Sequence, residues 1–98
     1  MVHKISFSPE ANTRLSQIVN YIQTEWSTEA ANTFLLILDD KISNFKLFPY
    51  SSPSFYNKKE IRKCVITKQI TLYYRIQDAE IEVITLFDSR QDTDKLHI

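Results

Sequence analysis

The stretch Ile70-Thr-Leu-Tyr-Tyr-Arg-Ile76 consists largely of β-branched and aromatic residues. Such a run is typical of a β-strand that has one face on a hydrophobic core. Side chains alternate between the two faces of a strand, so this run should have an inner and an open face. The residues expected on the inner face, toward helices, are Ile70, Leu72, Tyr74 and Ile76. The residues expected on the open side are Thr71, Tyr73 and Arg75.

Two similar runs flank this stretch, at Ile61 to Ile66 and at Ile81 to Phe87. Polar residues at Thr67 to Gln69 and at Gln77 to Glu80 separate the three runs and are few enough to form turns. Strands joined by short turns pair in antiparallel fashion. The last third of the chain is therefore predicted to be a three-stranded antiparallel meander.

Two amphipathic helices are predicted before the meander. Ser8 suits the N-cap of the first helix, Pro9 its first helical position, and Glu10 the positive end of its dipole. The apolar stripe of this helix recurs every three or four residues and consists of Ala11, Leu15, Ile18, Ile22 and Trp26. Ser27 with Glu29 repeats the start signal, so the first helix should end near Trp26 and a second should begin at once. The stripe of the second helix consists of Ala31, Phe34, Leu35, Leu38, Ile42 and Phe45.

The order of these elements predicts an α+β fold. Lys4 to Phe7 alternates in the manner of a short strand. The fold should then be an N-terminal strand, a helical hairpin and a three-stranded antiparallel meander, with one sheet packed against two helices. A length of 98 residues suits a single domain over residues 1–98 with one modest core.

The segment Leu47 to Asn57 is rich in proline, serine and aromatic residues. We expect it to be an irregular connection rather than a helix or an interior strand. Its aromatic residues Tyr50, Phe55 and Tyr56 are expected to pin the loop onto the core, with stacking on nucleic-acid bases as the alternative.

Composition excludes several classes of protein. No run reaches the roughly 18 apolar residues of a membrane span, and the first residues lack a secretory signal, so a cytoplasmic protein is expected. The chain has no glycine, which argues against phosphate-cradling loops and a nucleotide cofactor. Cys64 is the only cysteine and is expected to fill the core rather than to react. His3 and His97 lack metal-ligand spacing, so no metal site is expected.

Charge is unevenly distributed although the formal net charge is +0. From Lys46 through Arg75 seven basic residues stand against a single acidic one, Glu60. Acidic residues are in excess on both sides of this segment. The middle third is therefore the expected face for an anionic or acidic partner. The alternative is a solvated sheet edge kept soluble by lysines.

The chain resembles the RelE/ParE toxin family along nearly its whole length. In the helical half the resemblance rests on Ile5-Ser-Phe-Ser-Pro-Glu-Ala11, Ile18-Val-Asn-Tyr-Ile22 and Trp26-Ser-Thr-Glu-Ala30. In the sheet it rests on Ile61-Arg-Lys63, Leu72-Tyr-Tyr-Arg-Ile76 and Leu86-Phe-Asp-Ser-Arg-Gln-Asp92. The resemblance implies the growth-inhibiting toxin of a bacterial type II toxin-antitoxin pair of the plasmid-stabilization kind. A cognate antitoxin would fold onto its surface in a hetero-oligomeric complex, and no cofactor is implied.

The toxic act divides that family. RelE-like members cut mRNA in the ribosome, whereas ParE-like members poison DNA gyrase. RNA cleavage needs a base, an acid and cations for phosphate, and the candidate residues are Arg62, Lys63, Arg75 and Arg90.

Two departures weaken the nuclease interpretation. Thr71 stands where RelE-like nucleases carry an arginine, and no tyrosine follows Arg90. We therefore expect a ParE-like, non-hydrolytic toxin, with the nuclease and a non-toxic or decayed binding module as alternatives. As a purely structural alternative, Arg75 would pair with Glu82 or Glu80, and Arg90 with Asp88 or Asp92.

Overall fold

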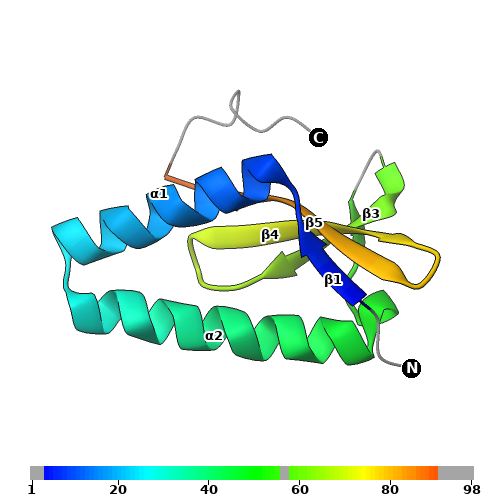
Figure 1. The fold of residues 1–98 in the computed structure, drawn as a ribbon, viewed down its shortest axis with the longest axis horizontal. Helices are drawn as coiled ribbons and strands as arrows, with labels where there is room; N and C mark the ends of the chain where they lie inside the picture. Colours follow the sequence, from blue (N-terminus) through cyan, green and yellow to red (C-terminus); the bar gives the residue numbers. More distant parts are fainter. Residues whose placement is uncertain (1–3, 56–57, 91–98) are drawn as a thin grey trace.

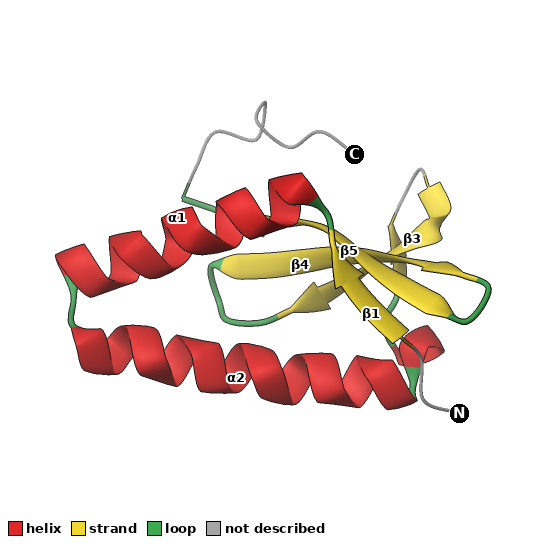
Figure 2. Ribbon diagram, viewed as in Figure 1, coloured by secondary structure: helices red, strands yellow, loops and turns green. Residues whose placement is uncertain are grey.

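The computed structural model describes residues 4–55 and 58–90. Its elements are β1 (Lys4–Phe7), α1 (Pro9–Glu25), α2 (Thr28–Leu47), a short 3₁₀ helix η1 (Pro49–Ser51), β2 (Ser54–Phe55), β3 (Lys58–Val65), β4 (Ile70–Gln77) and β5 (Glu80–Asp88). The two long helices form a hairpin beside a twisted sheet (Figures 1 and 2). The predicted α+β architecture is confirmed. No described helix has the length and apolar character needed to cross a membrane.

Both helices begin where the sequence predicted. The Ser8 hydroxyl accepts a hydrogen bond from the Ala11 N–H at 3.0 Å, and the Ser27 hydroxyl accepts one from the Ala30 N–H at 3.0 Å. These caps satisfy N–H groups that the first turn of a helix leaves free. Ser8 also donates its hydroxyl proton to the Ile84 carbonyl at 2.6 Å, so the start of α1 is fastened to β5.

The described strands form one sheet in the order β1-β5-β4-β3-β2. The meander of β3, β4 and β5 is antiparallel, as predicted. The N-terminal strand β1 pairs in parallel with β5 at the edge of the sheet, in a register that aligns Ile5 with Ile81. Parallel neighbours need a long crossover connection. The helical hairpin begins that crossover and leads the chain toward the opposite edge of the sheet.

The prediction for Leu47 to Asn57 needs correction. Leu47 is the last residue of α2, Pro49–Ser51 forms a 3₁₀ turn, and Ser54–Phe55 forms the edge strand β2. Proline permits both, because a 3₁₀ turn starts readily at Pro49 and an edge strand tolerates a neighbouring proline. Tyr50 is not pinned into the core, since its side chain is largely exposed. The side chains of Phe55 and Tyr56 lie outside the described residues.

A β-bulge in β5 decides which side chains face the helices. Tyr73 is aligned with Thr85 and Tyr74 with Val83, so Ile84 is an additional residue on β5. Strand alternation alone could not bury both Val83 and Leu86 on one face, because they lie three residues apart. The extra residue shifts the alternation by one position. Both side chains are consequently buried in the main core with Leu72 and Phe34.

Tyr74 joins the sheet to α2 and η1. Its ring stacks on Phe45 of α2 with centroids 4.2 Å apart, and both side chains are almost fully buried. Its hydroxyl donates a hydrogen bond of 2.5 Å to the Pro49 carbonyl. A buried carbonyl needs such a donor, because an unsatisfied one carries the full cost of its desolvation.

The open face of the sheet carries a small apolar cluster of its own. Ile61, Tyr73 and Phe87 are buried there, with Ile84 packed against them. Tyr73 was expected on the open side, which the strand register confirms. The cluster corrects the expectation of a single core.

We expect Tyr74→Phe to lower the free energy of unfolding by about 1–3 kcal/mol, because it keeps the ring stack and leaves the Pro49 carbonyl without its donor. Urea denaturation measures the change. Tyr50→Phe is the matched control, since an exposed tyrosine hydroxyl should contribute less than about 0.5 kcal/mol. Equal effects of the two substitutions would contradict the assigned role of the Tyr74 hydroxyl.

Candidate functional site

The four candidate cations do not converge on one site. Arg62 and Lys63 are successive residues of β3, so their side chains leave opposite faces of the sheet. Arg62 is aligned with Tyr74 on the helix side, whereas Lys63 is aligned with Tyr73 on the open side. Arg75 shares the open side with Lys63, and Arg90 follows the end of β5. Among the described residues, the carboxylates beside these cations are Glu82 and Asp88, and each is engaged in an ion pair with a candidate arginine.

Arg62 fastens the connection that follows α2. Its Nη1 donates a hydrogen bond of 2.7 Å to the Ser52 carbonyl. Its guanidinium carbon lies 4.9 Å from the ring centroid of Tyr50, a cation–π distance. The Lys63 N–H donates to the Pro53 carbonyl at 3.1 Å and strengthens the same junction. The contacts of Arg62 are therefore those of a residue that holds a loop on β3.

Arg75 forms the cross-strand ion pair that the structural alternative anticipated. Its Nη2 lies 2.6 Å from Oε1 of Glu82, which is its register neighbour on β5. Each side chain is a little more than one-third exposed, at 36% and 37%. The pair neutralises much of the charge that Arg75 would otherwise offer to phosphate. Lys63, on the same face, has an exposed side chain.

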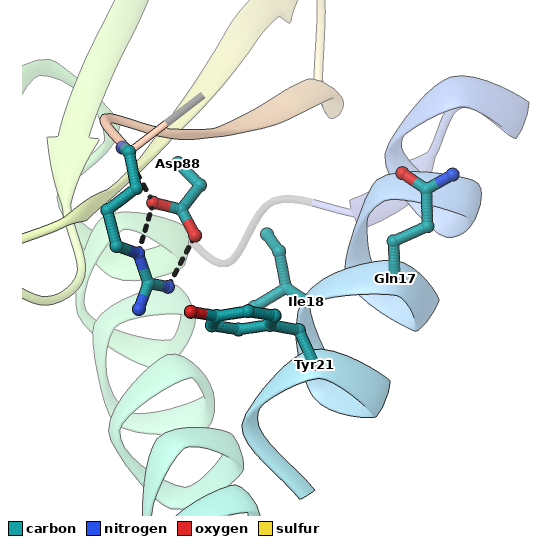
Figure 3. Close-up of a pocket in the computed structure, with 5 residues that line it drawn as sticks. Gln17, Ile18, Tyr21 and Asp88 are labelled. Atoms are coloured by element: carbon teal, nitrogen blue, oxygen red, sulfur yellow. Dashed lines mark hydrogen bonds and ion pairs between the residues drawn. The ribbon is translucent and has the colours of Figure 1, made fainter. Parts of the chain in front are cut away.

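Arg90 is held by Asp88 and Tyr21 at the end of β5. The Nε of Arg90 donates to Oδ1 of Asp88 at 2.8 Å, and its Nη2 donates to Oδ2 of the same carboxylate. The backbone N–H of Arg90 also donates to Oδ1, at 3.0 Å. The guanidinium carbon lies 4.7 Å from the ring centroid of Tyr21 on α1. Figure 3 shows the dashed contacts of Asp88 above the Tyr21 ring. The structural alternative is thus observed with Asp88, while Asp92 lies outside the described residues.

The pKa of Asp88 reflects this arrangement. Burial of the carboxyl acts to raise its pKa, but the hydrogen bonds and charge of Arg90 outweigh burial and hold the pKa below its ordinary value. The side-chain hydrogen bond to Asp88 raises the pKa of Arg90 in turn. Both groups are therefore charged near neutral pH, as a bidentate pair requires.

Two pockets meet at Arg90. A polar one of about 220 Å³ is lined by Gln17, Ile18, Tyr21, Asp88 and Arg90 (Figure 3). A mostly apolar one of about 230 Å³ lies toward the tip of the helical hairpin, where Ile22, Trp26 and Ile70 contribute to its wall. Sequence reasoning missed this junction, because no local pattern connects Tyr21 on α1 with a residue that follows β5.

Cys64, which was expected to fill the core, is poorly suited to reaction. Burial raises the pKa of its thiol, while the charge of Lys41 and a hydrogen bond with Ser52 act in the opposite direction. A raised pKa leaves little thiolate at neutral pH. Its side chain packs against the main core, in agreement with the role of core filler. Within residues 4–55 and 58–90, three or more potential metal ligands do not come together at any point. His3 and His97 lie outside those residues.

A family model identifies the family to which the sequence is similar. The sequence matches the family model described as "ParE toxin of type II toxin-antitoxin system, parDE" over residues 5–93. A search of curated protein sequences gave no match.

Solved structures share the fold. The chromosomal ParDE TA system from P. aeruginosa gives a TM-score of 0.74 at 10% identity, covering 89% of this chain and 96% of that one. The YoeB/ParE toxin from Agrobacterium tumefaciens gives 0.62 at 16% identity, covering 87% and 97%. The toxin-antitoxin complex RelBE2 from Mycobacterium tuberculosis gives 0.62 at 12% identity, covering 90% and 99%. At such low identities the likeness establishes a common fold.

Asp88→Asn should lower the free energy of unfolding by about 1 kcal/mol at pH 7, because it removes the charge that holds Arg90. The folded pKa of Asp88 is depressed, so the pair stabilises the fold above the ordinary carboxyl pKa of about 3.9. That contribution is lost as the pH falls through the folded pKa. Denaturation curves from pH 7 to pH 3 should accordingly converge for the two proteins at the acid end. Asp40→Asn, on the exposed side of α2, is the control and should leave the curve unchanged. A constant difference at all pH values would contradict the assigned ion pair.

Proposed function

Because the chain belongs to the ParE toxin family of type II toxin-antitoxin systems, we propose that it arrests growth by binding DNA gyrase, without cleaving RNA. A cognate antitoxin would silence it. This mode of action needs a recognition surface and no acid–base pair. The toxin and its antitoxin would act in the cytoplasm, where gyrase and its DNA substrate are found.

The main support for a non-hydrolytic toxin is that the four candidate cations lie apart from one another. A nuclease that activates the 2′-hydroxyl of RNA needs a base, an acid and cations around one phosphate. Arg62 lies on the helix side of the sheet, opposite Lys63. Arg75 and Arg90 are each paired with a carboxylate. Cations on opposite sides of the sheet, or already paired with carboxylates, are poorly placed to act together on one phosphate. They suit a protein that acts by binding.

An antitoxin partner fits the surface of the helical hairpin. Trp26 and Leu36 are each 72% exposed. Large apolar side chains at such exposure are typical of surfaces that another protein covers. A flexible antitoxin segment that folds on contact could cover them, which would give a hetero-oligomeric complex.

The decisive experiment is controlled expression of the chain alone, with growth, transcript integrity and plasmid supercoiling recorded together. We expect growth arrest with intact mRNA and altered supercoiling. The purified chain should inhibit supercoiling by gyrase, and the antitoxin should reverse the inhibition. These readouts separate the two toxic activities, because a gyrase poison changes DNA topology whereas a nuclease shortens transcripts.

The variant Lys63→Ala/Arg75→Ala removes both candidate cations of the open face, and Lys68→Ala in the exposed β3–β4 turn is its control. If the unaltered chain cleaved mRNA in a ribosome-dependent manner and this double variant did not, the proposal would be overturned in favour of a nuclease. Unimpeded growth on expression of the unaltered chain would overturn toxicity itself and leave a binding module or a decayed copy.

A further inference from the structure

The outer side of α2 carries two exposed leucines. The helix runs along one margin of the molecule (Figure 2), and its residues Phe34, Leu38 and Phe45 are buried in the main core. Leu36 and Leu47 lie on the opposite side of the helix and are 72% and 50% exposed. Leucine side chains left in water favour a contact that covers them.

The two leucines are the ends of one stripe along the helix. Steps of four, three and four residues lead from Leu36 to Asp40, Ser43 and Leu47. Residues at such spacings stand above one another on a helix. Asp40 and Ser43 are exposed as well. These four residues, which we call the α2 stripe, thus place an apolar side chain at each end and polar side chains between, over a length of about 17 Å.

The α2 stripe is complementary to a second copy of itself. Let two α2 helices pack in antiparallel fashion about a two-fold axis that passes between Asp40 and Ser43. Leu36 of each copy then meets Leu47 of the other, as the symmetry of such a contact requires. Ser43 of each copy meets Asp40 of the other, and its hydroxyl can donate to that carboxylate. Both apolar ends are covered in a single contact.

Charge also favours the antiparallel arrangement. Asp39 and Lys46 lie on the same flank of the α2 stripe, because seven residues make nearly two helical turns. In the antiparallel pair, Asp39 of one copy lies about 3 Å along the helix axis from Lys46 of the other. A parallel pair would instead set Asp39 against Asp39 and Asp40 against Asp40, and like charges repel. It would also align the two helix dipoles unfavourably.

We propose that the free chain forms a dimer in which two α2 helices pack antiparallel along the α2 stripe, with Leu36 against Leu47 of the second copy. The contact is limited to about three helical turns, so it is smaller than the interfaces of permanent dimers. The dimer is accordingly weak and depends on protein concentration. An antitoxin that covers Leu36 would have to displace the second copy, so the two associations exclude each other.

Sedimentation velocity of the full chain, made by cell-free synthesis, measures the association from micromolar concentration to the limit of solubility. We expect the sedimentation coefficient to rise from that of a monomer toward that of a dimer. Leu36→Ser/Leu47→Ser should remain monomeric, because it removes both apolar contacts. Val65→Ser is the control, since it changes a 58% exposed apolar residue on β3 and should leave the association unaltered.

Exchange of the flanking charges tests whether the contact joins two copies. Asp39→Lys and Lys46→Asp should each weaken the association several-fold, because each sets like charges against each other. The double variant Asp39→Lys/Lys46→Asp should restore it. The two positions are about 10 Å apart along one helix, so only a contact between copies explains the restoration.

Cross-linking tests the direction of the helices. In a Cys64→Ser background, Ser43→Cys places the new thiols of the two copies about 5 Å apart along the axis, whereas Asn32→Cys places them about 29 Å apart. A short bismaleimide should therefore join two Ser43→Cys chains and leave Asn32→Cys chains single. Both positions are exposed, so the reagent reaches each of them.

A chain that stays monomeric at every concentration would overturn the proposal. So would a dimer that persists in Leu36→Ser/Leu47→Ser, or one that cross-links equally at positions 32 and 43. None of these readouts depends on toxicity, so the dimer and the gyrase proposal stand or fail separately.

Discussion

The additional residue in β5 at Ile84 is the constraint on which the rest of the structure depends. It allows Val83 and Leu86 to face the helices together, and it sends Thr85 and Phe87 to the other side. The alternation after the bulge then turns Asp88 toward the helix side, where it is aligned with the buried Ile70. From that position its carboxylate holds Arg90 over Tyr21 of α1. A single shift of register thus sets the core, the second apolar cluster and the junction of the two pockets.

The positive charge of the middle third serves architecture as much as recognition. Arg62 on β3 contacts the Ser52 carbonyl and the Tyr50 ring. It therefore helps to hold the same turn that Tyr74 binds through the Pro49 carbonyl. Arg75 and Glu82 join β4 to β5. Surface cations used in this way have fewer donors free for phosphate. Arg62 and Arg75 of the basic segment therefore help to build the sheet, while Lys63 is an exposed cation on the open face.

The fold is shared with solved structures at low sequence identity. The chain shares 10–16% of its residues with three toxin structures of the same fold. The requirements of this fold are physical: capped helices of suitable length, alternating strands and a crossover that brings β1 beside β5. Many sequences meet these conditions, so one fold can be shared at low sequence identity.

Local patterns were sufficient for the starts of both helices, the helical hairpin and the three strands of the meander, because caps and apolar periodicity act over a few residues. They were also sufficient for the toxin-family resemblance. Local patterns could not predict the parallel pairing of β1 with β5, the edge strand β2 or the bulge at Ile84, since each depends on residues distant in sequence. The same holds for the candidate site. The pattern named Arg62, Lys63, Arg75 and Arg90, but only the packed sheet decided which face each side chain leaves and which carboxylate neutralises it. The meeting of Tyr21 with Arg90 belongs to tertiary structure alone, because the two residues are 69 positions apart in the sequence and touch only when α1 packs against β5.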